Sequence, residues 1–231
     1  MSAQDPRAGD AVDAPPTIRL SRIHTPVTVL GPGTRFGIWV QGCSIGCAGC
    51  VSRDTWDGAG GTDWSIDAVT EAFAQACVDD AVTGVTISGG EPFDQPAALQ
   101  ALVAGLRRHA RDHDRTIDIL CYSGYSERWL ERHRAAALDG IDALLWGPYV
   151  DGRPTDLVWR GSANQVLSPR SPLGHTRFDA YVDTARSRPE LQVAVGESLW
   201  LIGIPRRDDL ERVERSLADR GIELLDTSWS A

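Results

Sequence analysis

Three cysteines lie close together in the first quarter of the sequence, at Cys43, Cys47 and Cys50. Three residues separate the first pair and two the second, so one loop offers three thiolates, and no further cysteine is adjacent in sequence. Iron-sulfur clusters usually take four cysteine ligands, so three would leave one iron of a four-iron cluster open to a group that is not protein. A glycine directly before each cysteine lets the backbone wrap closely around such a cluster. The loop is therefore predicted to hold a [4Fe-4S] cluster with one reactive iron.

Structural zinc is the main alternative for these cysteines, because three cysteines and one histidine make an ordinary zinc site. The histidines form no companion motif, which disfavours zinc; they stand at His24, His109, His113, His133 and His175. A lone cysteine nucleophile fits less well, since a catalytic thiol needs no neighbours at these spacings. Cys77, on the apolar face of a predicted helix, and Cys121, at a strand end, are expected to be buried hydrophobic residues.

Composition and charge restrict where the protein acts and what it binds. Five cysteines do not indicate a disulfide framework, because the number is odd, three lie in one loop and the expected compartment is reducing. The net charge of -9 gives no electrostatic case for nucleic acid or an anionic membrane. No apolar run approaches the ~20 residues of a membrane span, and residues 1–16 lack the pattern of a secretory signal. A soluble, cytoplasmic protein is expected.

Strands and helices are predicted to alternate after a disordered lead-in over residues 1–16. An extended edge segment at 17–30 precedes strands at 36–41, 82–88, 116–121 and 141–146 and helices at 66–77, 99–106 and 126–137. Asp94 is expected to cap the second helix, with Pro96 in its first turn. Two strands, at 191–195 and 198–204, and a helix at 210–217 follow near the end. The stretch 147–189 is rich in loops, which often means that it lies over a site.

Repeated strand-helix units predict an α/β fold with a parallel sheet, whose active site gathers at the carboxyl ends of the strands. The cysteine loop and a Gly-Gly-Glu-Pro turn at 89–92 both follow predicted strands. Too few units are visible for an eight-fold barrel. We therefore expect one domain over residues 17–231, built as a partial (β/α)6 barrel with its helices outside.

Two motifs resemble those of the radical S-adenosylmethionine superfamily: the spacing of Cys43, Cys47 and Cys50, and the turn Ser88-Gly-Gly-Glu-Pro92, one strand-helix-strand unit further on. Alone, the turn could be an ordinary strand-to-helix connection, where glycine and proline are common. The resemblance implies that the three cysteines are the cluster ligands and the catalytic centre. It also implies that S-adenosylmethionine is held by a second group of residues: Gly49, Ser88, Gly89, Gly90, Glu91, Pro92 and Ser123.

The chemistry implied by this resemblance is radical initiation. The amine and carboxylate of S-adenosylmethionine chelate the open iron, and an electron from the cluster then cleaves the cosubstrate into methionine and a 5′-deoxyadenosyl radical that abstracts hydrogen. A low-potential electron donor, flavodoxin or ferredoxin, is implied as a partner.

Further segments resemble the activases of glycyl-radical enzymes. The lead-in over residues 29–43 is similar to activases in general, and residues 53–57 are similar to the pyruvate formate-lyase activase. Residues 47–50, 121–125 and 159–165 are similar to the anaerobic ribonucleotide reductase activase. The implied hydrogen donor is a glycine of a partner enzyme, although Trp146 and Glu91 depart from the reductase-activase pattern. A radical enzyme acting on a small molecule remains an alternative, and a non-enzymatic electron-transfer or zinc-binding module is a third possibility.

Overall fold

The structure is a computed structural model that describes residues 15–187, 191–195, 199–224 and 227. The lead-in predicted at 1–16 falls, apart from its last two residues, outside the described residues. Among the described residues, no helix is long and apolar enough to cross a membrane.

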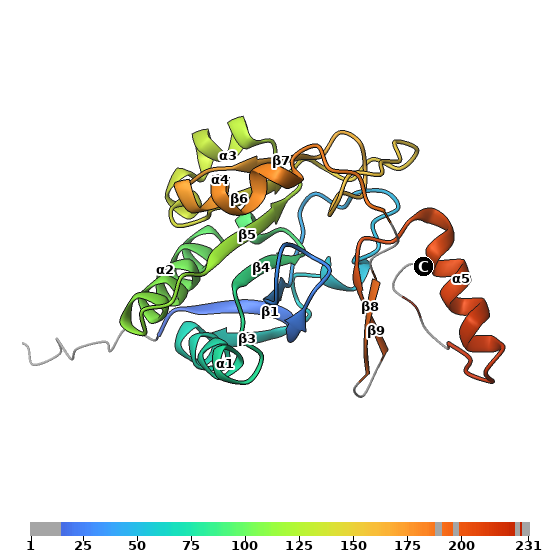
Figure 1. The fold of residues 1–231 in the computed structure, drawn as a ribbon, viewed down its shortest axis with the longest axis horizontal. Coiled ribbons are helices and arrows are strands. Elements are labelled where there is room, and N and C mark those ends of the chain that lie inside the picture. The colour runs from blue at the N-terminus through green and yellow to red at the C-terminus, as the bar shows by residue number, and fades with distance from the viewer. Residues whose placement is uncertain (1–14, 188–190, 196–198, 225–226, 228–231) are drawn as a thin grey trace, which may run out of the picture.

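A seven-stranded mixed sheet forms the centre of the molecule (Figure 1). Its strands, in spatial order, are β3 (Thr62–Ser65), β1 (Thr17–Val27), β2 (Arg35–Val40), β4 (Gly84–Gly89), β5 (Asp118–Ser123), β6 (Ala143–Trp146) and β7 (Val166–Pro169). The four strands β2, β4, β5 and β6 run parallel. β1 and β7 pair antiparallel with the two outer strands of this group, and β3 pairs antiparallel with β1. The strands predicted for the parallel part are confirmed. The six-unit barrel is not confirmed.

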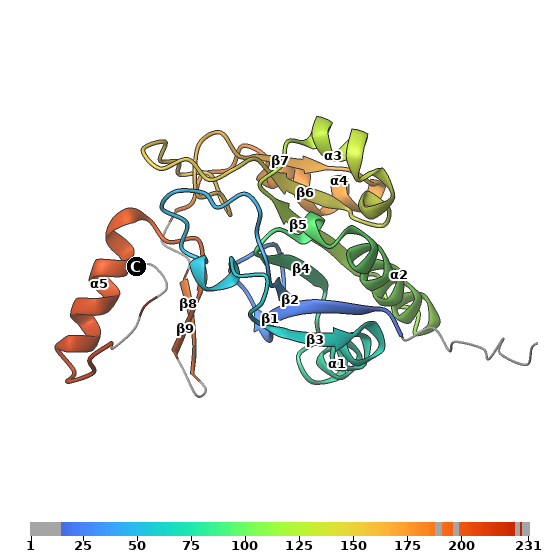
Figure 2. The ribbon, with the colours of Figure 1, turned by 180° about the vertical axis from the view of Figure 1, so that it is seen from behind.

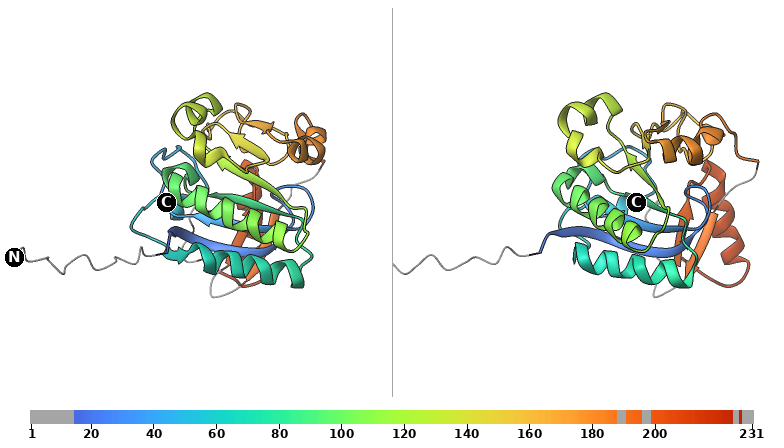
Figure 3. Two further views of the ribbon diagram at one scale, coloured as in Figure 1. Left: turned by 90° about the vertical axis from the view of Figure 1, so that its left-hand side faces the viewer. Right: turned by 60° about the vertical axis from the view of Figure 1, so that its left-hand side comes forward.

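Five α-helices accompany the sheets in the described part of the chain: α1 (Ile66–Asp79), α2 (Pro96–Asp112), α3 (Glu127–His133), α4 (Pro172–Phe178) and α5 (Arg207–Ala218). Short 3₁₀ turns lie at Arg53–Thr55, Pro92–Asp94, Ala135–Leu138 and Asp179–Tyr181. α1 and α2 lie side by side on one face of the sheet (Figure 3). The predicted cap of α2 is wrong: Gln95 stands at the N-cap, and the carboxylate of Asp94 binds Ser44 instead.

The central strands are apolar on both faces because both faces are covered. Along β5, Ile119 and Cys121 point into the core beneath α1 and α2. Leu120, between them, packs on the opposite face with Phe178 of α4. This alternation explains why the predicted strand at 116–121 has almost no polar positions.

The C-terminal part adds a separate hairpin, made of β8 (Leu191–Val195) and β9 (Leu199–Gly203). The hairpin stands beside the sheet, and α5 lies beyond it (Figures 1 and 2). Ile202 packs against Val27 and Leu30, which come from the far end of the sequence. The predicted C-terminal strands and helix are thus present, whereas β3, β7 and α4 are not among the predicted elements.

A buried ion pair joins the amino ends of three neighbouring parallel strands. Arg35 on β2 donates to the Asp118 carboxylate on β5 at 2.7 Å, and both side chains are at most 1% exposed. The guanidinium also donates to the Thr86 hydroxyl at 2.5 Å and to the Val85 carbonyl at 2.6 Å, both on β4. Because a buried charge is costly without partners, this network ties β2, β4 and β5 together.

Replacing Asp118 with alanine should leave the Arg35 guanidinium buried without its counter-charge. We expect the free energy of unfolding, measured by urea titration, to fall by roughly 3–5 kcal/mol. The exposed pair Arg19–Asp63 provides the control, since Asp63→Ala should have only a small effect. Equal losses for the two variants would show that the buried pair does not organise the strands.

Candidate functional site

The cysteine loop leaves the carboxyl end of β2 and closes on itself. The Gly42 N–H donates to the Thr55 carbonyl at 2.8 Å, and the Cys43 N–H donates to the Trp56 carbonyl at 3.1 Å. The Gln41 side-chain amide, just before the loop, donates to the backbone carbonyls of residues 54 and 57. The three cysteines therefore lie in a loop whose two ends are held together.

The turn that follows β4 is in close backbone contact with the start of this loop. The Gly90 N–H donates to the Val40 carbonyl at 2.9 Å, and the Glu91 N–H donates to the Gly42 carbonyl at 2.9 Å. A methyl group added to Gly90 would lie 2.1 Å from that same Gly42 oxygen. Only glycine fits here, because the backbone that precedes Cys43 occupies the space of a side chain.

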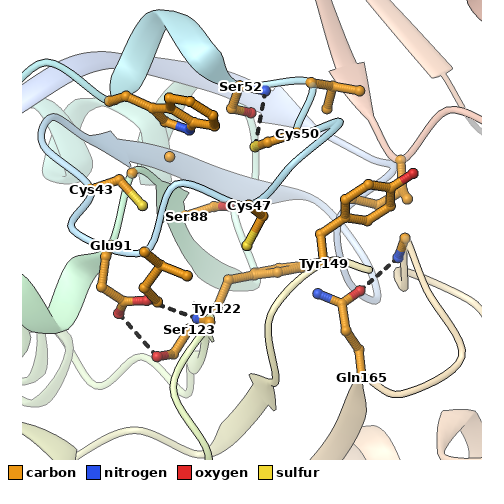
Figure 4. Close-up of a pocket in the computed structure, with 18 of the residues that line it drawn as sticks. Cys43, Cys47, Cys50, Ser52, Ser88, Glu91, Tyr122, Ser123, Tyr149 and Gln165 are labelled. Atoms are coloured by element: carbon orange, nitrogen blue, oxygen red, sulfur yellow. Dashed lines mark hydrogen bonds between the residues drawn. The ribbon is translucent and has the colours of Figure 1, made fainter. Parts of the chain in front are cut away.

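A cavity of about 170 Å³ brings the predicted site residues together (Figure 4). Its lining includes every residue predicted to bind the cluster or the cosubstrate except Pro92: Cys43, Cys47, Gly49, Cys50, Ser88, Gly89, Gly90, Glu91 and Ser123. Pro92 is buried behind the cavity, in the 3₁₀ turn after Glu91. Parallel strands place these side chains together, since β2, β4 and β5 all end at this edge of the sheet.

The three thiols are free and half-buried. Burial raises the pKa of Cys43 and of Cys47 above the ordinary value of a thiol. No fourth cysteine and no histidine lines the cavity within the described residues. Nor, in that part of the chain, are three histidine, cysteine or acidic side chains arranged to hold a single metal ion. A set of three soft sulfur donors in one closed loop fits an iron-sulfur cluster.

Glu91 joins the turn to the end of β5. Its buried carboxylate accepts hydrogen bonds from the Gly124 N–H at 2.7 Å, the Ser123 hydroxyl at 2.9 Å and the Phe93 N–H at 3.0 Å. Burial raises the pKa of Glu91 to about 7, and these three donors act against that rise. Both carboxylate oxygens therefore bind the protein itself, so Glu91 fixes the shape of the turn.

A second carboxylate, that of Asp94, binds the cysteine loop at Ser44. Its position in the sequence predicted a helix cap instead. Asp94 accepts hydrogen bonds from the Ser44 N–H at 2.7 Å, from the Ser44 hydroxyl at 3.0 Å and from the Tyr125 hydroxyl at 2.9 Å. No sequence pattern joins these three residues. Their pairing depends on the folded positions of β2, the turn after β4 and the start of α3.

Further lining residues come from two later parts of the chain. Tyr149, Gly161 and Gln165 belong to the loop-rich stretch that was expected to lie over a site. The Gln165 side-chain oxygen accepts from the Gly161 N–H at 2.8 Å, which fixes this loop (Figure 4). Ile204 and Pro205, just after β9, were not predicted, because two apolar residues at a strand end carry no functional signal.

Comparison with known proteins identifies the domain. The sequence model of the 4Fe-4S single cluster domain family matches residues 29–168, more than half of the chain. The chain belongs to this family. The matched region contains the three cysteines, the turn after β4 and the loop that carries Gln165.

Several relatives share the name anaerobic ribonucleoside-triphosphate reductase-activating protein. The chain is 33% identical to that of Vibrio cholerae over 148 residues, which cover 62% of this chain and 94% of the relative. It is 31% identical to that of Haemophilus influenzae over 140 residues, covering 59% and 88%. For Enterobacteria phage T4 the identity is 31% over 148 residues, covering 63% and 90%. The resemblance to glycyl-radical-enzyme activases noted from the motifs is thereby confirmed.

Gly90→Ala should displace the backbone that leads into Cys43, since the added methyl group meets the Gly42 carbonyl. We expect a loss of stability of roughly 1–3 kcal/mol in urea unfolding, as for other overpacked sites. The matched control is Gly58→Ala, at a position where an added methyl group meets nothing within 4 Å. Two variants of equal stability would contradict the close fit of turn and loop.

Alanine at Cys43, Cys47 or Cys50 should remove most of the iron and the brown colour from anaerobically reconstituted protein, because each thiolate is a ligand in the predicted set. Iron content and the visible absorption spectrum measure this loss. Cys77→Ala serves as the control, since Cys77 is buried in α1 and does not line the cavity. Full iron content in all three loop variants, or a colourless protein containing zinc, would overturn the assignment.

Proposed function

We propose that this chain is a radical S-adenosylmethionine activase that removes a hydrogen atom from a glycine of a partner glycyl-radical enzyme. The observation that carries the proposal is the incomplete ligand set: three cysteines from one loop share a cavity with the turn after β4. The names of the relatives support anaerobic ribonucleotide reductase as the first candidate partner. Flavodoxin or ferredoxin is the proposed electron donor.

Cys43, Cys47 and Cys50 are the proposed ligands of a [4Fe-4S] cluster, and S-adenosylmethionine is the proposed cosubstrate. When bound, a reduced cluster would supply the electron that splits the cosubstrate into methionine and a 5′-deoxyadenosyl radical, which takes a hydrogen atom from the donor and becomes 5′-deoxyadenosine.

The turn at Gly89, Gly90 and Glu91 is proposed to bind the amine of the methionine moiety. All three residues line the cavity that the thiols share, and Glu91 holds the turn rigid through Ser123 and Gly124. A rigid turn matters because a bound group that is held in one orientation reacts faster than a mobile one. Gly49 and Ser88, which line the same cavity, are proposed as further contacts to the cosubstrate.

The loop that carries Tyr149 and Gln165 is proposed to cover the reacting groups. The Gln165 side chain also donates to the Gly147 carbonyl at 3.1 Å, so the two ends of this loop are joined at the cavity. A covered cavity keeps water away from a reactive species. We further propose that the sheet is the partial barrel of the radical enzymes, that residues 17–231 form one domain and that the protein acts in the cytoplasm.

A radical enzyme that acts on a small molecule is the second candidate. Two observations favour it: Trp146 stands where reductase activases tend to have an acidic residue, and Ile204 and Pro205, which line the cavity, lie outside the region that the family model matches. Both candidates require the same cluster and the same cosubstrate.

Reconstituted protein supplied with dithionite and S-adenosylmethionine should release 5′-deoxyadenosine. After incubation with anaerobic ribonucleotide reductase, electron paramagnetic resonance should show the doublet of a glycine-centred radical. Cys47→Ala should give neither product nor doublet. Release of 5′-deoxyadenosine without a doublet, together with deuterium transfer from a labelled small molecule, would favour the second candidate; absence of 5′-deoxyadenosine would contradict both.

A further inference from the structure

A second cavity, of about 130 Å³, lies next to the one that contains the cysteines. The two cavities share lining residues on both sides: Val51, Ser52 and Ser88 from the core of the domain, and Ile204 and Pro205 from the C-terminal part. The two cavities are therefore direct neighbours, separated only by these shared residues.

The C-terminal part forms most of the second cavity. Leu199 and Leu201 of β9 and Leu210 of α5 line one side, and Trp39 of β2 lines the other. The charged groups in the lining, Arg22 and Asp54, form an ion pair with each other. The Arg22 guanidinium also lies 4.9 Å from the centre of the Trp200 ring. With its charges paired, the cavity favours an apolar group over a charged one.

The wall of this cavity is attached to the rest of the domain at several points. The Gln192 side chain bonds to the backbone in the way that a neighbouring strand would. Its oxygen accepts from the Thr28 N–H at 3.1 Å, and its nitrogen donates to the Pro26 carbonyl at 2.6 Å. The Arg186 guanidinium donates to the Ile204 carbonyl at 2.6 Å. These contacts place Ile204 and Pro205 between the two cavities. The whole wall lies beyond residue 168, where the family match ends.

We propose that the second cavity binds an apolar side chain of the same polypeptide that presents its glycine to the first cavity. This inference rests on the proposed function, since it specifies how the partner polypeptide is held. A peptide suits two neighbouring cavities because its residues repeat every ~3.3–3.6 Å when extended, so that adjacent side chains can enter different cavities. One residue can then enter the cysteine cavity while a neighbour lies between Trp39 and β9. The C-terminal hairpin thus selects the partner by the apolar residue next to its glycine.

Short peptides test this directly with the reconstituted full-length protein. Each carries one Cα-deuterated glycine in an alanine-serine background, with leucine, alanine or glutamate at one of the four positions on either side. Calorimetry in the presence of S-adenosylmethionine measures the dissociation constant, and mass spectrometry measures deuterium in 5′-deoxyadenosine. At one spacing, leucine should bind about 10-fold or more tightly than alanine, and glutamate should bind no better than alanine.

Two adjacent positions on the hairpin give a matched pair of variants. Leu199 lines the second cavity, whereas Val195, its cross-strand neighbour, is 82% exposed and does not. Leu199→Glu should abolish the preference for leucine, and Val195→Glu should retain it. Leu210→Glu, on α5, repeats the test from a different element in case a change in β9 disturbs the hairpin.

The outcomes separate the two proposals. A leucine preference at one spacing that both cavity variants remove supports the inference. No preference at any spacing, a preference that survives both variants, or binding of free indole to this cavity without any gain for peptides would overturn it. A leucine preference in binding with no deuterium transfer and no glycine-centred radical would leave the second cavity as a peptide site and overturn the proposed activase function.

Discussion

The site depends on one backbone contact, the hydrogen bond from the Glu91 N–H to the Gly42 carbonyl. It joins the second residue after β2 to the second residue after β4. The backbone at Gly90 lies so close to Gly42 that a side chain would not fit between them. Since Gly42 directly precedes Cys43, the position of the first thiol is set by the turn. The close approach explains why the turn begins with two glycines and why a cysteine loop and a turn so far apart in sequence line one cavity.

Two buried hydrogen-bond networks hold the same strands at opposite ends. At the amino ends, Arg35 binds Asp118 and joins β2 to β5 across β4. At the carboxyl ends, the Glu91 carboxylate binds Ser123 and Gly124 and joins β4 to β5 again. Buried charges stabilise a structure only when all their partners are in place, so these networks favour one register of the strands over others. The positions of the cavity residues follow from that register. The cysteine loop alone does not determine it.

The parallel strands and the cysteine loop were predictable because both have strong local signals. Strand β2 is a continuous apolar run, and the cysteines have a fixed spacing. β3 was not predictable, since Thr62–Ser65 is short and polar and is a strand only because it pairs with the start of β1. β7 ends in a proline and lies within the stretch whose sequence predicts loops. Asp94 illustrates a different limit: its position before a helix indicated a cap, but the carboxylate instead binds Ser44 and Tyr125, which reach it only in the folded chain.

The C-terminal hairpin links stability to recognition. Val27 and Leu30 are almost fully buried and share one apolar cluster with the hairpin residue Ile202, so the hairpin covers apolar surface at the edge of the core. The same hairpin leads into Ile204 and Pro205, which line both cavities. Apolar contacts have no preferred direction, so one apolar residue can replace another of similar size. The residues of the hairpin can therefore change while the hairpin keeps its position. A domain whose cysteine loop and turn must keep their geometry can therefore alter the substrate that it accepts by changing this attached segment.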